Sequence, residues 1–181
     1  MTKVINLLGG PGIGKSTLAA ELYAKMKRSG MNVELVREVA KEWAWEGKKI
    51  GPFEQIAIIG EQIRKESSLF SKAEYVITDS PVLLGAFYLQ HNFKVSFMNQ
   101  MVKDYYKYAE SENIKFLNYV LPRRAGQYDP KGRFEDEIGA INVDISLKMY
   151  LDDKNYYYID FLSHVNDEDM INSIIEDLSY I

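Results

Sequence analysis

The stretch Gly9-Gly10-Pro11-Gly12-Ile13-Gly14-Lys15-Ser16 matches the pattern G-x-x-x-x-G-K-[ST] at every fixed position. Residues 3–8 before it are mostly apolar and predict a buried strand, and residues 15–28 after it have the apolar spacing of a helix. Glycines let such a turn adopt positive φ angles, so that successive backbone N–H groups surround an anion at the start of the helix. This context predicts a P-loop that binds a nucleoside triphosphate.

We expect ATP and Mg²⁺ as the ligands of this loop. Lys15 would reach the β- and γ-phosphates, and Ser16 would offer its hydroxyl to magnesium. The residues expected to bind the nucleotide are Gly9, Gly10, Gly12, Ile13, Gly14, Lys15, Ser16 and Thr17. For Thr17, inside the predicted helix, a purely structural role is the alternative. A chance match in a glycine-rich turn is disfavoured by the flanking strand and helix.

The rest of the chain alternates between apolar strands and amphipathic helices. Further strands are predicted at 32–36, 74–78, 114–121 and 156–160, and further helices at 38–48, 52–70, 81–90, 95–112, 141–151 and 167–178. This order predicts an α/β fold, a three-layer α/β/α sandwich around a five-stranded, mainly parallel sheet. No repeat or linker interrupts it, so we expect one P-loop kinase domain over residues 1–181.

Composition limits the classes of function. The 181 residues are 46% hydrophobic and 27% charged, with a formal net charge of −4 and no cysteine. These values predict a globular domain without disulfides or thiolate metal sites. No apolar run approaches the roughly 18 residues that span a bilayer, and no signal peptide is visible, so we expect a cytoplasmic protein without a membrane partner. The negative charge disfavours a protein dedicated to duplex DNA, although a local basic cleft is compatible with it.

A carboxylate ends the third predicted strand, which reads Tyr-Val-Ile-Thr before Asp79. Ligands of parallel sheets bind at the carboxyl ends of the strands, so Asp79 is expected beside the P-loop as a magnesium ligand. The alternative is a cap for the next helix, and both roles are compatible. The following residue is Ser80, where ATP-driven motors commonly have a water-activating glutamate, and no Asn-Lys-x-Asp segment of guanine-specific switches occurs. These absences favour phosphoryl transfer over a hydrolytic cycle.

Arg37 and Glu38 follow the second predicted strand and should face the same crevice. Glu38 is the candidate base for an acceptor hydroxyl, with Asp79 as the alternative base, and Arg37 would hold a phosphate. An ordinary helix start is the competing interpretation, because acidic residues favour that position. Trp43 is a candidate to stack on a ring of the acceptor, or else a core residue.

An irregular segment at 122–140 contains Arg123, Arg124 and Arg133. Arginines on a closing element neutralise the charge of a transferring phosphoryl group, so this segment is predicted to be a lid. The alternative is a solvated basic loop, and which arginine acts is open.

With these motifs in place, the chain resembles the ribosylnicotinamide-kinase-like (NadR-like) ATPase family of P-loop kinases. Residues 36–42, Val-Arg-Glu-Val-Ala-Lys-Glu, resemble that family's Arg-Glu-x-Ala-Arg pattern, although Lys41 stands where arginine is usual. The position of Asp79 and, less closely, the loop to Arg133 also resemble the family. Related nucleoside, nucleotide and polynucleotide kinases share this core.

The resemblance implies a kinase that transfers the γ-phosphoryl group of ATP to a hydroxyl or phosphate of a nucleoside- or nucleotide-like acceptor. One alternative is a kinase acting on DNA or RNA, at a 5′-hydroxyl or at a hydroxymethylated base such as 5-hydroxymethyluracil. Another is a nucleotide-dependent binding switch. The chain would act as a monomer or homodimer.

Overall fold

The computed structural model describes residues 1–124, 128 and 136–180. Its centre is a five-stranded sheet of order β2-β3-β1-β4-β5, in which every neighbouring pair is parallel. The strands are β1 (Thr2–Leu8), β2 (Val33–Val36), β3 (Tyr75–Thr78), β4 (Ile114–Val120) and β5 (Ile159–Asp160). The predicted α/β fold with a five-stranded parallel sheet is confirmed.

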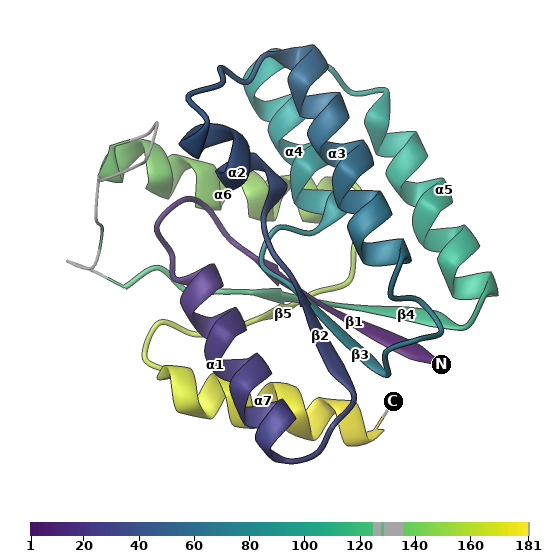
Figure 1. Ribbon diagram of the computed structural model, residues 1–181. Helices are drawn as coiled ribbons and strands as arrows, with labels where there is room; N and C mark the ends of the chain where they lie inside the picture. Colours follow the sequence, from purple (N-terminus) through teal and green to yellow (C-terminus); the bar gives the residue numbers. More distant parts are fainter. Residues whose placement is uncertain (125–127, 129–135, 181) are drawn as a thin grey trace.

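Helices cover both faces of this sheet, which makes three layers (Figure 1). They are α1 (Lys15–Arg28), α2 (Val39–Trp45), α3 (Pro52–Ser67), α4 (Val82–Phe93), α5 (Met98–Ser111), α6 (Glu137–Asp153) and α7 (Asp167–Tyr180). Helices α1 and α7 lie on one face, whereas α3, α4, α5 and α6 lie on the other. Every residue of β1 is buried, as expected for a central strand of a sheet covered on both sides.

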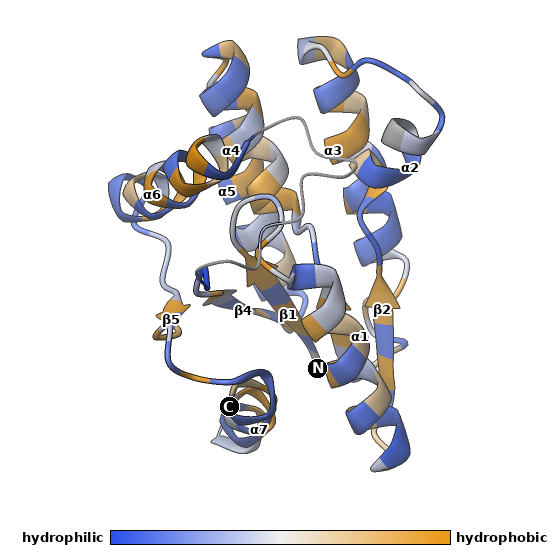
Figure 2. Cartoon of the chain, turned by 90° about the vertical axis from the view of Figure 1, so that its left-hand side faces the viewer, coloured by the Kyte–Doolittle hydropathy of each residue, from blue (hydrophilic) through white to orange (hydrophobic). Residues whose placement is uncertain are grey.

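Two large apolar clusters form the core, one on each face of the sheet. Strand β1 contributes Ile5 to the cluster under α1 and α7 and Leu8 to the cluster under α4, α5 and α6. This division follows from the alternation of side chains along a strand. Strand β2, at the sheet edge, mixes hydrophobic and hydrophilic residues, as Figure 2 shows.

Several predicted boundaries are wrong. The segment 122–140, expected to be irregular, already contains the first turn of α6, because the Asp136 carboxylate accepts the Gly139 N–H at 2.7 Å and caps the helix. The last strand is only Ile159–Asp160, shorter than the predicted 156–160. The remaining elements occur in the predicted order. At α7 the cap is Asn166, whose side-chain oxygen accepts the Asp169 N–H at 2.9 Å.

The register of the sheet decides which loops meet. Asn6 of β1 lies opposite both Thr78 of β3 and Asn118 of β4, and Leu8 lies opposite Val120. The P-loop after β1 is therefore flanked by the segments that leave β3 and β4 at the same edge. Within the described ranges, none of the helices is both long and apolar enough to cross a membrane.

Candidate functional site

The P-loop connects β1 to α1 in a conformation suited to an anion. Gly12 and Gly14 have φ angles of +72° and +99°, in the left-handed region that favours glycine. No acidic residue lies in the first turn of α1, so nothing there opposes the positive end of the helix dipole. Lys15 Nζ donates to the carbonyl oxygens of Gly9 at 2.8 Å and Gly10 at 2.9 Å, which folds the lysine over the loop. Ser16 and Thr17 are exposed.

Asp79 follows β3 and is only 4% exposed. Its Oδ1 atom is buried without a hydrogen-bond partner in the described part of the chain. It does not cap α4, whose first residue follows Pro81 and has no side-chain cap. A buried carboxylate oxygen without a donor is costly unless a cation or water binds it. This buried Oδ1 atom of Asp79 is therefore suited to be a magnesium ligand.

Such a site would take few ligands from the protein. Among the described residues, no group of three His, Cys, Asp or Glu side chains gathers as a metal site. Magnesium commonly binds one or two protein oxygens, with phosphate and water completing its shell. Ser16 and Asp79 together match that donor set.

A cavity of about 590 Å³ opens beside the P-loop, between α2, α3 and α4. Pro11, Lys15, Glu38 and Ser80 line it on the P-loop side. Its apolar lining residues include Ile50, Ile58, Ile59, Val82, Leu84 and Phe93. The structure thus brings the predicted base, Glu38, and the predicted phosphate-binding lysine, Lys15, to one cavity, next to the segment that follows Asp79.

Two residues predicted to bind the acceptor lie outside this lining. Arg37 is exposed, and Trp43 is covered by Lys48, whose Nζ lies 4.8 Å from the ring centroid. The cavity is instead lined by Trp45, which is 82% exposed at the end of α2. Both tryptophans are visible in the sequence, but which of them faces the cavity depends on how α2 packs on α3.

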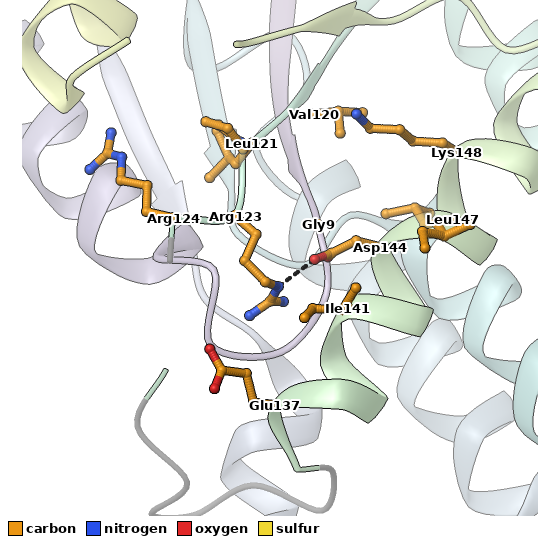
Figure 3. A pocket seen from close by; sticks show the side chains of 12 residues that line it. Gly9, Val120, Leu121, Arg123, Arg124, Glu137, Ile141, Asp144, Leu147 and Lys148 are labelled. Carbon is orange, nitrogen blue, oxygen red and sulfur yellow. Dashed lines mark hydrogen bonds and ion pairs between the residues drawn. The ribbon is translucent and has the colours of Figure 1, made fainter. Parts of the chain in front are cut away.

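The arginines after β4 point in different directions (Figure 3). Arg123 Nε lies 2.5 Å from Asp144 Oδ2 of α6, and its Nη2 donates to the Pro11 carbonyl oxygen at 2.8 Å. Arg124 turns away and binds Asp167 at 2.6 Å, at the start of α7. Arg133 and most of the predicted lid lie outside the described residues.

A second, smaller cavity of about 410 Å³ lies on the α6 side of the P-loop. Gly9, Arg123 and Asp144 line it. No local motif in the sequence indicates Asp144, which lies 134 positions after Gly10 in an otherwise ordinary helix.

A buried polar network lies beneath the large cavity. Gln62, which lines the cavity, donates from Nε2 to Glu66 at 3.0 Å and to Thr78 Oγ1 at 3.1 Å. Tyr105 also donates to Glu66, at 3.4 Å. Burial raises the pKa of Glu66 to about 7, more than these hydrogen bonds lower it. Sequence reasoning missed this group, since a glutamate near the end of a helix is usually exposed.

Comparison with known proteins agrees with the geometry. Residues 4–167 match a family described as an AAA domain, AAA_28. The chain belongs to this family. It is a P-loop domain, as the motif predicts, and no curated protein matches it.

Solved structures with the same fold include two kinds of protein. Deoxyadenosine kinase from M. mycoides, with the products dCMP and dCDP, has a TM-score of 0.61 and 16% identity over 98% of this chain and 100% of its own. NadR in complex with NR has a TM-score of 0.71 and 15% identity over 97% of this chain. A second NadR structure, with NAD and AMP-PNP, gives a TM-score of 0.68 at 14% identity.

The likeness is one of fold, because all three identities are low. The chain spans 51% and 49% of the two NadR chains, about half their length. The resemblance to NadR-like P-loop proteins is confirmed at the level of the domain and its fold.

Proposed function

We propose that this chain is an ATP-dependent phosphotransferase that transfers the γ-phosphoryl group of ATP to a hydroxyl of a nucleoside-like acceptor. The observation that carries the proposal is the 590 Å³ cavity, which is lined by both Lys15 of the P-loop and Glu38 after β2. A cavity of this volume suits a small molecule. The kinase and NadR structures with the same fold hold nucleotides or NR, which supports this choice of acceptor.

The charge of the cavity favours a hydroxyl acceptor over a phosphate acceptor. The charged side chains among its described lining are Lys15, Glu38 and Lys41, and none of them comes from α3 or α4. Those two helices contribute apolar groups and the uncharged polar residues Gln55, Gln62, Tyr88 and Asn92. Phosphate groups are usually held by arginines or several lysines. An uncharged ring fits the α3–α4 wall better than a second phosphate does.

In this proposal the chain catalyses transfer by positioning and electrostatics. Lys15 holds the β- and γ-phosphates. The hydroxyl oxygen of the acceptor forms a bond to the γ-phosphorus while the bond from the γ-phosphorus to ADP breaks, and Glu38 accepts the proton of that hydroxyl. Ser16 and Asp79 would hold magnesium, which supplies charge neutralisation between the phosphates when bound. Arg123 forms an ion pair with Asp144, and Arg124 forms one with Asp167. We therefore assign the binding of the phosphates to Lys15.

The test is transfer of labelled γ-phosphate from ATP to a panel of nucleosides and their 5′-monophosphates. We expect nucleosides to be phosphorylated and monophosphates to be poorer acceptors. Lys15→Ala should abolish transfer. Glu38→Gln should lower kcat by roughly 10²- to 10⁴-fold while ATP still binds, as removal of a general base does. Full activity of Lys15→Ala would refute the proposal.

One observation favours a second candidate, a kinase acting on the end of a DNA or RNA strand. Trp45 is 82% exposed and lines the cavity, and its neighbours Lys48 and Lys49 are exposed too. An exposed aromatic ring among lysines suits the stacking of a base outside the cavity. Under this candidate, oligonucleotides with a 5′-hydroxyl would be better acceptors than nucleosides, and their binding would weaken steeply with salt.

A further inference from the structure

Two neighbouring residues in the first half of the P-loop, Gly10 and Pro11, have no free backbone N–H group for a phosphate. Pro11 has no N–H group, and the Gly10 N–H donates to Asp144 Oδ1 at 2.7 Å. The amides that follow Pro11 are those of residues 12–16, in the second half of the loop. Gly10 and Pro11 therefore act as an anchor of the loop, and this anchor is attached to α6.

The attachment is a compact, charged contact. The Asp144 carboxylate binds the Gly10 N–H with one oxygen and Arg123 Nε with the other. Arg123 in turn donates to the Pro11 carbonyl oxygen at 2.8 Å. The side chains of Arg123 and Asp144 are only 13% and 17% exposed, so water screens the pair little. Figure 3 shows the two side chains meeting beside the loop at Gly9.

The glycine at position 10 fits this contact. A Cβ there would lie 2.6 Å from Asp144 Oδ1 and 3.1 Å from the Ala140 carbonyl oxygen. The loop and α6 thus approach each other more closely than any other residue would allow. Tyr128 also packs on the loop, with its Cδ2 atom 2.9 Å from where a Cβ on Gly12 would lie.

We propose that Asp144 is a positioning residue for the triphosphate, which acts through Gly10 and Arg123 and does not touch the ligand. It holds the first half of the P-loop against α6, so that the amides of residues 12–16 are already arranged before the nucleotide binds. Arg123 then links Asp144 to the Pro11 carbonyl oxygen. This inference rests on the proposed binding of ATP, which is tested separately by measuring MgATP binding to the wild-type chain.

The experiment measures MgATP binding by calorimetry for wild type, Asp144→Asn and a matched control, Asp160→Asn. Asp160 also pairs with a cation of α6, Lys148 at 2.7 Å, but that pair is at the surface and bonds no P-loop atom. Because hydrogen bonds to charged groups contribute substantially, we expect Asp144→Asn to raise the Kd for MgATP by about tenfold to hundredfold and the control to leave it unchanged. Exchange of the Gly10 amide hydrogen, followed by NMR, should accelerate only in Asp144→Asn.

A role in stability alone predicts a different result. In that case Asp144→Asn would lower the melting temperature but bind MgATP as wild type does below it, which would overturn the inference. If Asp144→Asn does not fold, the double variant Arg123→Ala/Asp144→Ala removes both buried charges together and is expected to fold with the same loss of affinity. Wild-type affinity in that variant would equally overturn the inference. No binding by the wild type would instead refute the proposed function.

Discussion

At the scale of single residues, Asp79 is a position where a substitution should impair function without lowering stability. Its buried Oδ1 atom has no partner in the described part of the chain, so the carboxylate costs folding free energy unless a ligand binds it. Asp79→Asn removes the charge and keeps the shape. We expect it to raise the magnesium concentration for half-maximal transfer by at least roughly tenfold, with unfolding free energy unchanged or higher. Magnesium titrations and urea unfolding of the same sample measure both effects.

The control for this residue is Asp104→Asn, an exposed aspartate of α5 that accepts a hydrogen bond from Gln100. It should alter neither the magnesium requirement nor the unfolding free energy beyond a few tenths of a kcal/mol. An Asp79→Asn variant that loses stability and keeps its magnesium requirement would mark Asp79 as a structural residue.

The position of Glu38 beside the P-loop could be predicted from the sequence, whereas residues placed by helix packing could not. Asp79 comes directly after β3 and Glu38 lies two residues after β2, and parallel strand ends meet at one edge of a sheet. Asp144 and Glu66 reach the site region from helices, α6 and α3, whose rotation about their own axes depends on contacts across the core. No local pattern around either residue distinguishes it from an exposed helix acid.

At the scale of elements, the contact between α3 and α4 forms one wall of the large cavity. Gly85 of α4 lies so close to α3 that an added Cβ would be 2.7 Å from Ile59 Cγ1. That atom is near the backbone of a buried residue and cannot move aside easily. Gly85→Ala should therefore force the helices apart and lower the unfolding free energy by about 1–3 kcal/mol, measured in urea.

Gly60→Ala on α3 is the matched control. An added Cβ at Gly60 meets nothing within 4 Å, and alanine is the better helix former, so this variant should be more stable by roughly 0.5–1 kcal/mol. Gly85→Ala should also change the KM for the acceptor, because Gly85 lines the cavity and Gly60 does not. Equal stability of the two variants would show that the α3–α4 contact relaxes without cost.

Element boundaries were predictable where a local signal is strong. The predicted range 15–28 coincides with α1, because the P-loop sets its start and Gly30, with a φ of +79°, follows its end. The start of α6 was missed, since a glycine at position 139 looks like a loop residue although the Asp136 cap holds the turn together. Strand β5 pairs with β4 through only two residue pairs, which apolar patterning does not reveal.

At the scale of the whole molecule, Glu66 makes the free energy of unfolding depend on pH. Glu66 is 1% exposed, and burial raises its pKa from 4.5 to about 7. Between these values the folded chain binds more protons than the unfolded chain, so its stability falls as pH rises from about 4.5 to 7. The cost above pH 7 is roughly 3–4 kcal/mol, at about 1.4 kcal/mol per pKa unit.

Glu66→Gln isolates this contribution from those of other titrating groups. The glutamine keeps an acceptor for Gln62 and carries no charge, so the variant should match wild type near pH 4.5 and exceed its stability by roughly 3–4 kcal/mol at pH 8. Urea unfolding at a series of pH values measures the difference. Glu61→Gln, on the exposed side of the same helix, is the control and should show no such trend. A stability difference for Glu66→Gln that stays constant from pH 4.5 to 8 would mean that Glu66 is ionised throughout this range, with its charge compensated inside the fold.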